Sequence, residues 1–170
     1  MRLDQPGGCT MNPTTFLSLA IDPALQLLPG KMQRREARVM LLAIALQESR
    51  IQHRRQIRGP ARGYFQFEHG GGVAGVLRHP ATRPHIEQAC RDLDYPADVD
   101  ACYIAIEHND VLAAAFARLN LWWLPTPLAD NEQDGWHQYL AAWRPGNPHP
   151  GTWPDLYRQA VMTVTNGCPT

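Results

Sequence analysis

The feature that most constrains this chain is an unbroken run of eight apolar residues, Val39 to Leu46, inside a stretch of helical character from Lys31 to Ser49. A helix that is apolar on nearly every side cannot face water, so we expect it at the centre of the fold. With 170 residues, the chain fits one domain and can bury roughly two-thirds of the surface that its unfolded form exposes. The sequence therefore predicts a domain that contains one central, buried helix.

Helical patterns dominate the rest of the chain, and strand signals are scarce. Residues 50–69 contain several Gly and Pro breaks and are interpreted as a loop, with a short hairpin around residues 64–67. We therefore predict a mainly α fold with at most a small β element near this loop. It forms a single domain over residues 13–170, after a loose leader at residues 1–12. Further helices are expected at Thr14–Leu28, at Gly72–Leu77, from Thr82 onward, and at Asp98–Leu119, Glu132–Trp143 and Pro154–Val164.

The charges are balanced overall but unevenly distributed. Sixteen basic residues match sixteen acidic ones, and nine of the basic residues lie between Lys31 and Arg62. This segment either steers an anionic polymer toward one face or is a solvated basic surface. The neutral net charge argues against nucleic acid as the partner. No segment has the apolar length of a signal peptide or a membrane span, so we expect no membrane insertion and delivery by another route.

The cysteines and histidines do not form a metal-binding pattern. Cys9, Cys90, Cys102 and Cys168 are widely scattered, and the seven histidines show no ligand spacing. Cys90 and Cys102 flank a turn and could pair if oxidised, but free buried thiols are the favoured interpretation. We therefore expect no metal and no cofactor.

Glu48 is the candidate catalytic residue. Ala37, Leu41, Ile44 and Glu48 share one helical face, so an apolar stripe ends in a carboxylate. Partial desolvation would raise the pKa of this carboxyl, as a general acid near neutral pH requires. The alternative is an ordinary solvated glutamate at a helix end, close to the basic side chain of Arg50.

The loop that follows adds a second candidate element. Gly63 would let the backbone approach a ligand closely, and Gln66 lies between the aromatic residues Phe65 and Phe67. Sugars present apolar ring faces and many hydroxyl groups, which aromatic rings and amides suit. The alternative is a buried hairpin whose aromatic side chains only fill the core.

Together these segments resemble the lysozyme-like superfamily, and most closely the soluble lytic transglycosylases. That family has a Glu-Ser pair at the end of a helix and then a Gly-aliphatic-Met-Gln-aliphatic segment, which read Glu48-Ser49 and Gly63–Phe67 here. The likeness extends from about Lys31 to Val164. Its Tyr-Asn pair in a third motif reads Trp143-Arg144, so its tyrosine is missing unless Tyr139 replaces it. Weaker matches are Asp110–Phe116, Tyr139–Gly146, Pro154, Tyr157 and Val161.

The resemblance implies a peptidoglycan-degrading glycosidase that acts as a monomer on glycan strands. Glu48 would protonate the oxygen between N-acetylmuramic acid and N-acetylglucosamine, with help from the substrate's own N-acetyl group. Proton return from the sugar's 6-hydroxyl gives a 1,6-anhydro end, whereas return from water gives hydrolysis as in lysozyme. Glu68 is a possible second carboxylate. The implied substrate-binding residues are Ser49, Gly63, Tyr64, Phe65, Gln66, Tyr139 and Trp143.

Two other classes of function remain open at this point. One is an inert glycan-binding or structural protein on the same fold, and the other is nucleic-acid binding through residues 50–62. As an enzyme, the chain would reach the cell wall or periplasm by cell lysis, in a bacteriophage particle, or through a secretion apparatus.

Overall fold

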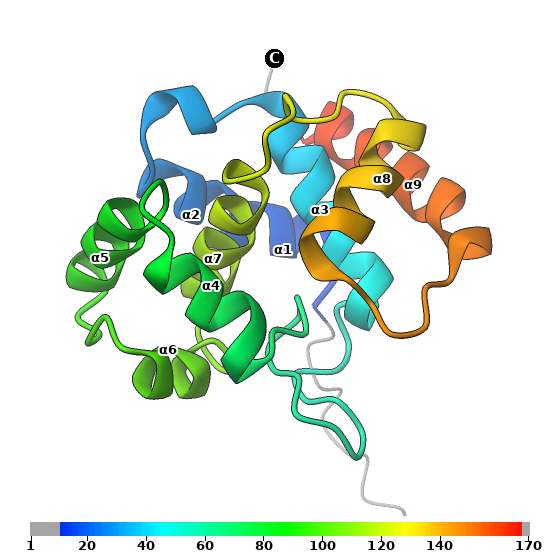
Figure 1. Cartoon of the computed structure of the whole chain (residues 1–170). Helices are drawn as coiled ribbons and strands as arrows, with labels where there is room; N and C mark the ends of the chain where they lie inside the picture. Colours follow the sequence, from blue (N-terminus) through cyan, green and yellow to red (C-terminus); the bar gives the residue numbers. More distant parts are fainter. Residues whose placement is uncertain (1–10, 168–170) are drawn as a thin grey trace, which may run out of the picture.

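The computed structural model describes residues 11–167, and helices account for most of them (Figure 1). The prediction of a mainly α fold is confirmed. The α-helices are α1 (Pro13–Phe16), α2 (Asp22–Gln26), α3 (Arg35–Ser49), α4 (Ala74–Arg78), α5 (Arg83–Asp92), α6 (Val99–Ala105), α7 (Asp110–Trp122), α8 (Glu132–Trp143) and α9 (Trp153–Asn166). Short π- and 3-10-helical turns are η1 (Leu17–Ile21), η2 (Gly30–Met32), η3 (His69–Val73) and η4 (Pro150–Thr152).

Helix α3 lies at the centre of the fold, as its sequence predicts. Every residue from Val39 to Leu46 is buried. Helix α3 packs against α9 and α7, and Figure 1 shows it running through the middle of the molecule with α8 and α9 on one side. Because the middle of α3 is covered on all faces, its C-terminal turn lies against the protein and is only partly open to solvent.

Several predicted helix boundaries are wrong. The expected helix Asp98–Leu119 is two helices, because Asn109 begins a new one: its side chain accepts a hydrogen bond of 2.9 Å from the N–H of Leu112. Asn is a favoured N-cap residue, and this local bond competes with a continuous helix. Helix α3 begins at Arg35, after the separate turn η2. The predicted bounds of α8, in contrast, are confirmed.

Residues 11 and 12, which the prediction placed in the leader, pack with the domain. Asn12 caps α1 by accepting a bond of 2.9 Å from the N–H of Thr15, and Met11 packs partly against the core. Residues 1–10 of the predicted leader lie outside the described residues. Cys9 and Cys168 also lie outside them. Cys90 and Cys102 are buried free thiols with their Sγ atoms 3.7 Å apart.

The expected β element near Phe65 is reduced to two isolated bridges in residues 11–167. They pair Arg62 with Arg55 and with Phe67. Arg62 and Phe67 exchange two backbone hydrogen bonds of 2.9 Å, which close the segment 62–67 into a hairpin-like turn. Gly63 lies inside this turn with φ +70°.

Ion pairs attach the loop of residues 50–62 to the turn after α6 and to the first residue of α7. The guanidinium of Arg54 contacts both carboxylate oxygens of Asp110, at 2.5 and 2.8 Å. The carboxylate of Glu107 accepts a hydrogen bond of 2.9 Å from the guanidinium of Arg55 and a second one from that of Arg62. Burial by itself would raise the pKa of Glu107, but the two guanidinium groups outweigh burial and lower it. Three arginines of the basic segment are therefore used within the fold.

Ser49 connects the end of α3 to the same loop. Its hydroxyl lies 2.7 Å from the carbonyl oxygen of Tyr64 and 3.1 Å from that of Ala45, and it accepts a bond of 3.2 Å from the N–H of Ile51. Ser49 is buried, so water cannot replace these partners freely.

We expect Ser49→Ala to lower the free energy of unfolding by about 1–3 kcal/mol, because it leaves buried backbone groups without a partner. Denaturant unfolding followed by circular dichroism measures this. Thr163→Ala is the matched control, because the Thr163 hydroxyl binds a carbonyl of its own exposed helix turn. An equal loss in both variants would contradict the proposed role of Ser49.

Candidate active site

A groove of about 760 Å³ opens where the C-terminal ends of α3, α7 and α8 meet two loops. One loop is the segment 56–72, and the other is the connection 144–149 between α8 and η4. Five of the predicted site residues line it: Glu48, Gln66, Glu68, Tyr139 and Trp143.

Glu48 is half-buried in the last turn of α3, with its side chain at the groove. Burial raises the pKa of this carboxyl to about 7, because the charged form loses contact with water. The hydroxyl of Tyr139 donates a hydrogen bond of 2.6 Å to Oε1 of Glu48, which favours the ionised form and lowers the pKa in part. The result is a carboxyl group that exchanges its proton near neutral pH.

Tyr139 is held rigidly by aromatic packing. Its ring stacks on Trp153 of α9, with centroids 5.4 Å apart and an interplanar angle of 14°, and it also contacts Trp136. Burial, followed by the neighbouring charge of Glu48 and the hydrogen bond to it, raises the pKa of Tyr139 above its ordinary value. The phenol therefore stays protonated and remains a donor to Glu48.

Trp143 and Phe67 form an aromatic wall of the groove. Their rings stack with centroids 5.5 Å apart and an interplanar angle of 29°. The indole N–H of Trp143 donates to the carbonyl oxygen of Phe65 at 2.9 Å, which fixes the orientation of the ring. Such a wall can pack against the apolar face of a sugar ring.

Gln66 and Glu68 provide polar groups on the same side of the groove. The amide nitrogen of Gln66 donates to the carbonyl oxygen of Gly63 at 2.8 Å, with a longer contact of 3.3 Å to that of His53. Its side-chain oxygen remains available to accept a bond from a ligand. Glu68 is exposed, and its carboxylate makes no hydrogen bond or ion pair with the residues 11–167.

Four other residues predicted to bind substrate lie behind the groove rather than in it. Ser49 and Phe65 are buried and are occupied by the contacts described above. A Cβ atom on Gly63 would lie 2.5 Å from the carbonyl oxygen of Ile106, so the close approach that requires glycine is to α6–α7 and not to a ligand.

Tyr64 is the fourth predicted substrate-binding residue that lies behind the groove. It packs edge-on against Phe16, with centroids 5.4 Å apart, and the guanidinium of Arg54 lies 4.3 Å from its ring centroid. For these four positions, the alternative interpretation of a loop that fills the core fits the structure.

Sequence reasoning missed several groove residues, including Asn120, Arg144 and the segment Gly70–Gly72. Asn120 lies in the apolar pattern of α7 and is buried, with its amide bound to the carbonyl oxygen of Ala142 at 3.1 Å. The sequence around Asn120 could not identify it as a groove residue, because only the packing of α7 against α8 brings it to the groove. Trp123, at the end of α7, also lines the groove.

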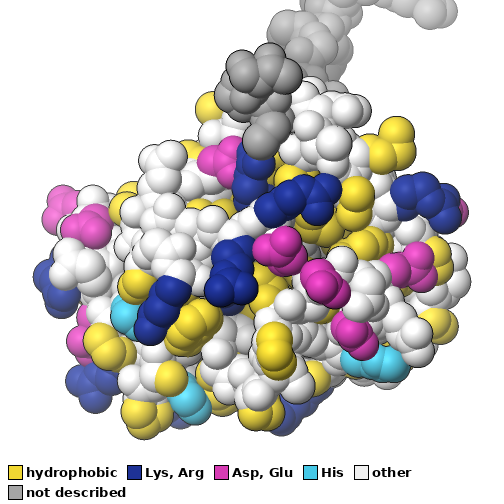
Figure 2. Space-filling model, turned by 90° about the horizontal axis from the view of Figure 1, so that it is seen from above, with side chains coloured by type: hydrophobic (Ala, Val, Ile, Leu, Met, Phe, Trp, Pro, Cys, Tyr) yellow, Lys and Arg dark blue, Asp and Glu magenta, His cyan; other side chains and the backbone are white. Residues whose placement is uncertain are grey.

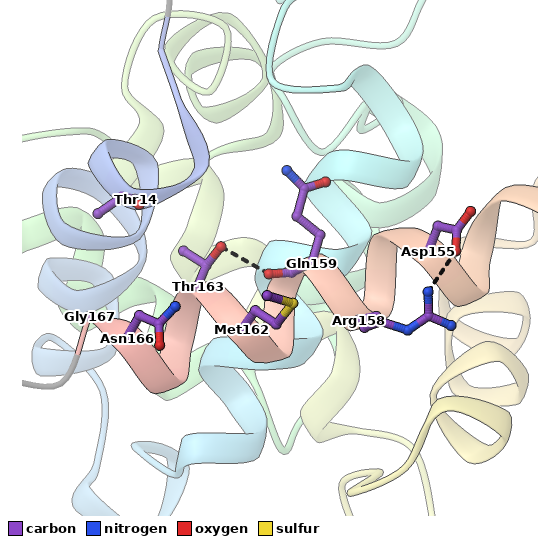
Figure 3. A pocket seen from close by; sticks show the side chains of 8 residues that line it. All are labelled: Thr14, Asp155, Arg158, Gln159, Met162, Thr163, Asn166 and Gly167. Atoms are coloured by element: carbon purple, nitrogen blue, oxygen red, sulfur yellow. Dashed lines mark hydrogen bonds and ion pairs between the residues drawn. The ribbon is translucent and has the colours of Figure 1, made fainter.

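A second pocket, of about 520 Å³, lies along the outer face of α9 (Figure 3). Asp155 and Arg158, the charged residues that line it, are exposed and pair with each other at 2.9 Å. It lacks the buried ionisable group and the aromatic wall of the Glu48 groove. We therefore place the candidate active site at Glu48.

Ion pairs reduce the positive charge that the basic segment could offer to nucleic acid, because Arg54, Arg55 and Arg62 contact Asp110 and Glu107. On the face seen from above in Figure 2, Lys and Arg side chains lie beside Asp and Glu side chains, so neither sign dominates that face. In the described part of the chain, no helix has the length and apolar character to cross a membrane, and no three His, Cys, Asp or Glu side chains converge as metal ligands would.

Comparisons with models of protein families, with curated proteins and with solved structures found no match. A function for the groove is therefore inferred from its geometry and chemistry.

We expect Tyr139→Phe to raise the pKa of Glu48 above its value of about 7, by up to about one pH unit, because the lost hydrogen bond stabilises the ionised carboxylate. Nuclear magnetic resonance titration of carboxyl-labelled glutamate measures this directly, without an activity assay. Tyr157→Phe is the control, since Tyr157 packs on Trp153 without a hydrogen bond to Glu48. A fall in the Glu48 pKa would contradict the assignment.

Proposed function

We propose that this protein is a peptidoglycan-degrading glycosidase that cleaves the β-1,4 bond between N-acetylmuramic acid and N-acetylglucosamine, as a lytic transglycosylase. One observation carries the proposal: a half-buried carboxyl with a pKa of about 7 opens onto a groove with an aromatic wall. A general acid works best when its pKa lies near the working pH, and a sugar chain suits a long groove with aromatic and amide groups.

In the proposed reaction, Glu48 first acts as an acid. Its proton passes to the glycosidic oxygen, the bond from that oxygen to the sugar's C1 breaks, and positive charge develops at C1. The carbonyl oxygen of the substrate's own N-acetyl group stabilises this centre, so a second protein carboxylate is not required. The sequence of steps uses no metal or cofactor.

Glu48 then acts as a base. The ionised carboxylate accepts the proton of the sugar's 6-hydroxyl while that oxygen forms a bond to C1, which gives a 1,6-anhydro end and restores the protonated acid. Tyr139 is a positioning residue here, since its bond to Oε1 orients the carboxyl and leaves Oε2 for proton transfer. Trp143 and Gln66 would hold the sugar.

Hydrolysis of the lysozyme type is the second candidate, and the presence of Glu68 in the groove favours it. A carboxylate there could orient a water molecule that replaces the 6-hydroxyl as nucleophile. In either case, the proposed partner is peptidoglycan in the cell wall, reached by cell lysis, a phage particle or a secretion apparatus.

We expect Glu48→Gln to reduce clearing of a cell-wall suspension by at least about 100-fold, because the variant has no proton to donate.

Wild-type activity should fall above pH 7, about tenfold per pH unit, since only the protonated carboxyl is the acid and its pKa is about 7. For the Glu48→Gln test, the control is Glu36→Gln, which makes the same change in the first turn of α3, at the opposite end of the helix from Glu48. Full activity of the Glu48 variant would exclude this mechanism, and an inactive wild type that still binds glycan would favour an inert binding protein.

Mass spectrometry of the digested wall distinguishes the two reactions. Transglycosylation should yield fragments lighter by the mass of one water than the products of hydrolysis, because the sugar's own hydroxyl replaces water as the nucleophile. Digestion by a known hydrolytic lysozyme gives the reference masses. Products that match that reference would replace the transglycosylase assignment with a muramidase.

A further inference from the structure

Arg144 is a cation placed at the rim of the Glu48 groove. It ends α8 in the left-handed conformation, with φ 48° and ψ 52°, and its N–H donates to the carbonyl oxygen of Leu140 at 3.0 Å. It follows Trp143 directly, so the aromatic wall and this charge come from adjacent residues. The side chain of Arg144 is exposed and lines the groove.

The positive charge of Arg144 has no partner within the described part of the fold. In residues 11–167, its guanidinium makes no ion pair and no hydrogen bond. Arg54, Arg55 and Arg62, in the neighbouring loop, are in contrast paired with Asp110 and Glu107. Of the Lys and Arg side chains that the structure describes, Arg144 is the one that lines the groove.

A free guanidinium at a polar groove is suited to bind a carboxylate, which it can contact through two parallel N–H groups. The carboxylate of Glu68, which also lines the groove, would repel such a ligand without a compensating cation. Arg144 could donate only hydrogen bonds to an uncharged glycan, whereas a carboxylate on the sugars would add an ion pair.

We infer that Arg144 recognises a substrate carboxylate and thereby selects acidic glycan strands over neutral ones. This inference rests on the proposed function. In peptidoglycan the carboxylate has two possible sources: the lactyl group of N-acetylmuramic acid where the peptide is absent, and the peptide itself where the lactyl carboxyl is consumed in an amide bond.

Arg50 provides an internal comparison. It is also an exposed arginine that ends a helix in the left-handed conformation, with φ 56° at the end of α3, but it does not line the groove. Both arginines can interact favourably with the negative end of a helix dipole. Of these two arginines, only Arg144 combines that position with access to the groove. Comparing variants at the two positions therefore distinguishes an effect on the helix end from an effect on ligand binding.

The test measures binding in protein that also carries Glu48→Gln, so that the ligand is not consumed. Three probes of equal sugar number are titrated by calorimetry: peptide-free glycan strands, strands with stem peptides, and a chitin oligomer without carboxylates. We expect Arg144→Gln to weaken binding of at least one carboxylate-bearing probe by about fivefold, the effect of an exposed ion pair, and to leave chitin binding unchanged.

Two further variants complete the experiment. Arg144→Lys should retain part of the affinity, because it keeps the charge but loses the two parallel N–H contacts, and Arg50→Gln should retain all of it. A loss confined to peptide-free strands assigns the lactyl carboxylate, and a loss confined to peptide-bearing strands assigns the peptide. Added salt should reduce the preference for the acidic probe.

Other results overturn the inference. Equal binding of acidic and neutral probes by the Arg144-containing protein, or an equal loss for all probes in Arg144→Gln, would show that Arg144 does not select carboxylates. Those results leave the proposed function intact. Absence of binding to any of the three probes would instead remove both the inference and the proposed function.

Discussion

Burial of the middle of helix α3 is the constraint on which the rest of the structure depends. Its run from Val39 to Leu46 must be covered on every side, and α7 and α9 pack against it. The last turn of α3 is therefore partly enclosed, and the carboxyl of Glu48 is held where water stabilises its charge poorly. The raised pKa of Glu48 follows from this enclosure, while Tyr139 limits the rise and orients the carboxyl.

The sequence predicts the parts that depend on local patterns and fails where distant segments meet. Periodicity indicates the buried helix, the carboxyl at its end and the bounds of α8, and the spacing of Tyr139 and Trp143 puts both on one helical face. Local sequence could not show which way the aromatic residues of the loop would point. Phe65 turns into the core, where it is fully buried and its ring lies 5.9 Å from that of Phe16 in α1.

The basic segment is a second case in which local sequence does not show which distant residues meet, here for charged side chains. A cluster of arginines reads as a surface for an anionic polymer, but Arg54, Arg55 and Arg62 bind the turn after α6 and the first residue of α7. Their carboxylate partners follow some 45 to 56 residues later in the chain, so no local pattern reveals the pairing. Arg144, which looked like a simple departure from a motif, is instead the cation left available at the groove.

The hydrogen bond between Tyr139 and Glu48 joins residues that are 91 positions apart in the chain. During synthesis on the ribosome, Glu48 emerges long before α8 exists to enclose it, and a carboxyl in water has ordinary acidity. The shifted acid therefore arises only after the C-terminal helices have docked. A chain cut before α8 would therefore lack the Tyr139 partner and would leave the Glu48 carboxyl closer to its ordinary acidity.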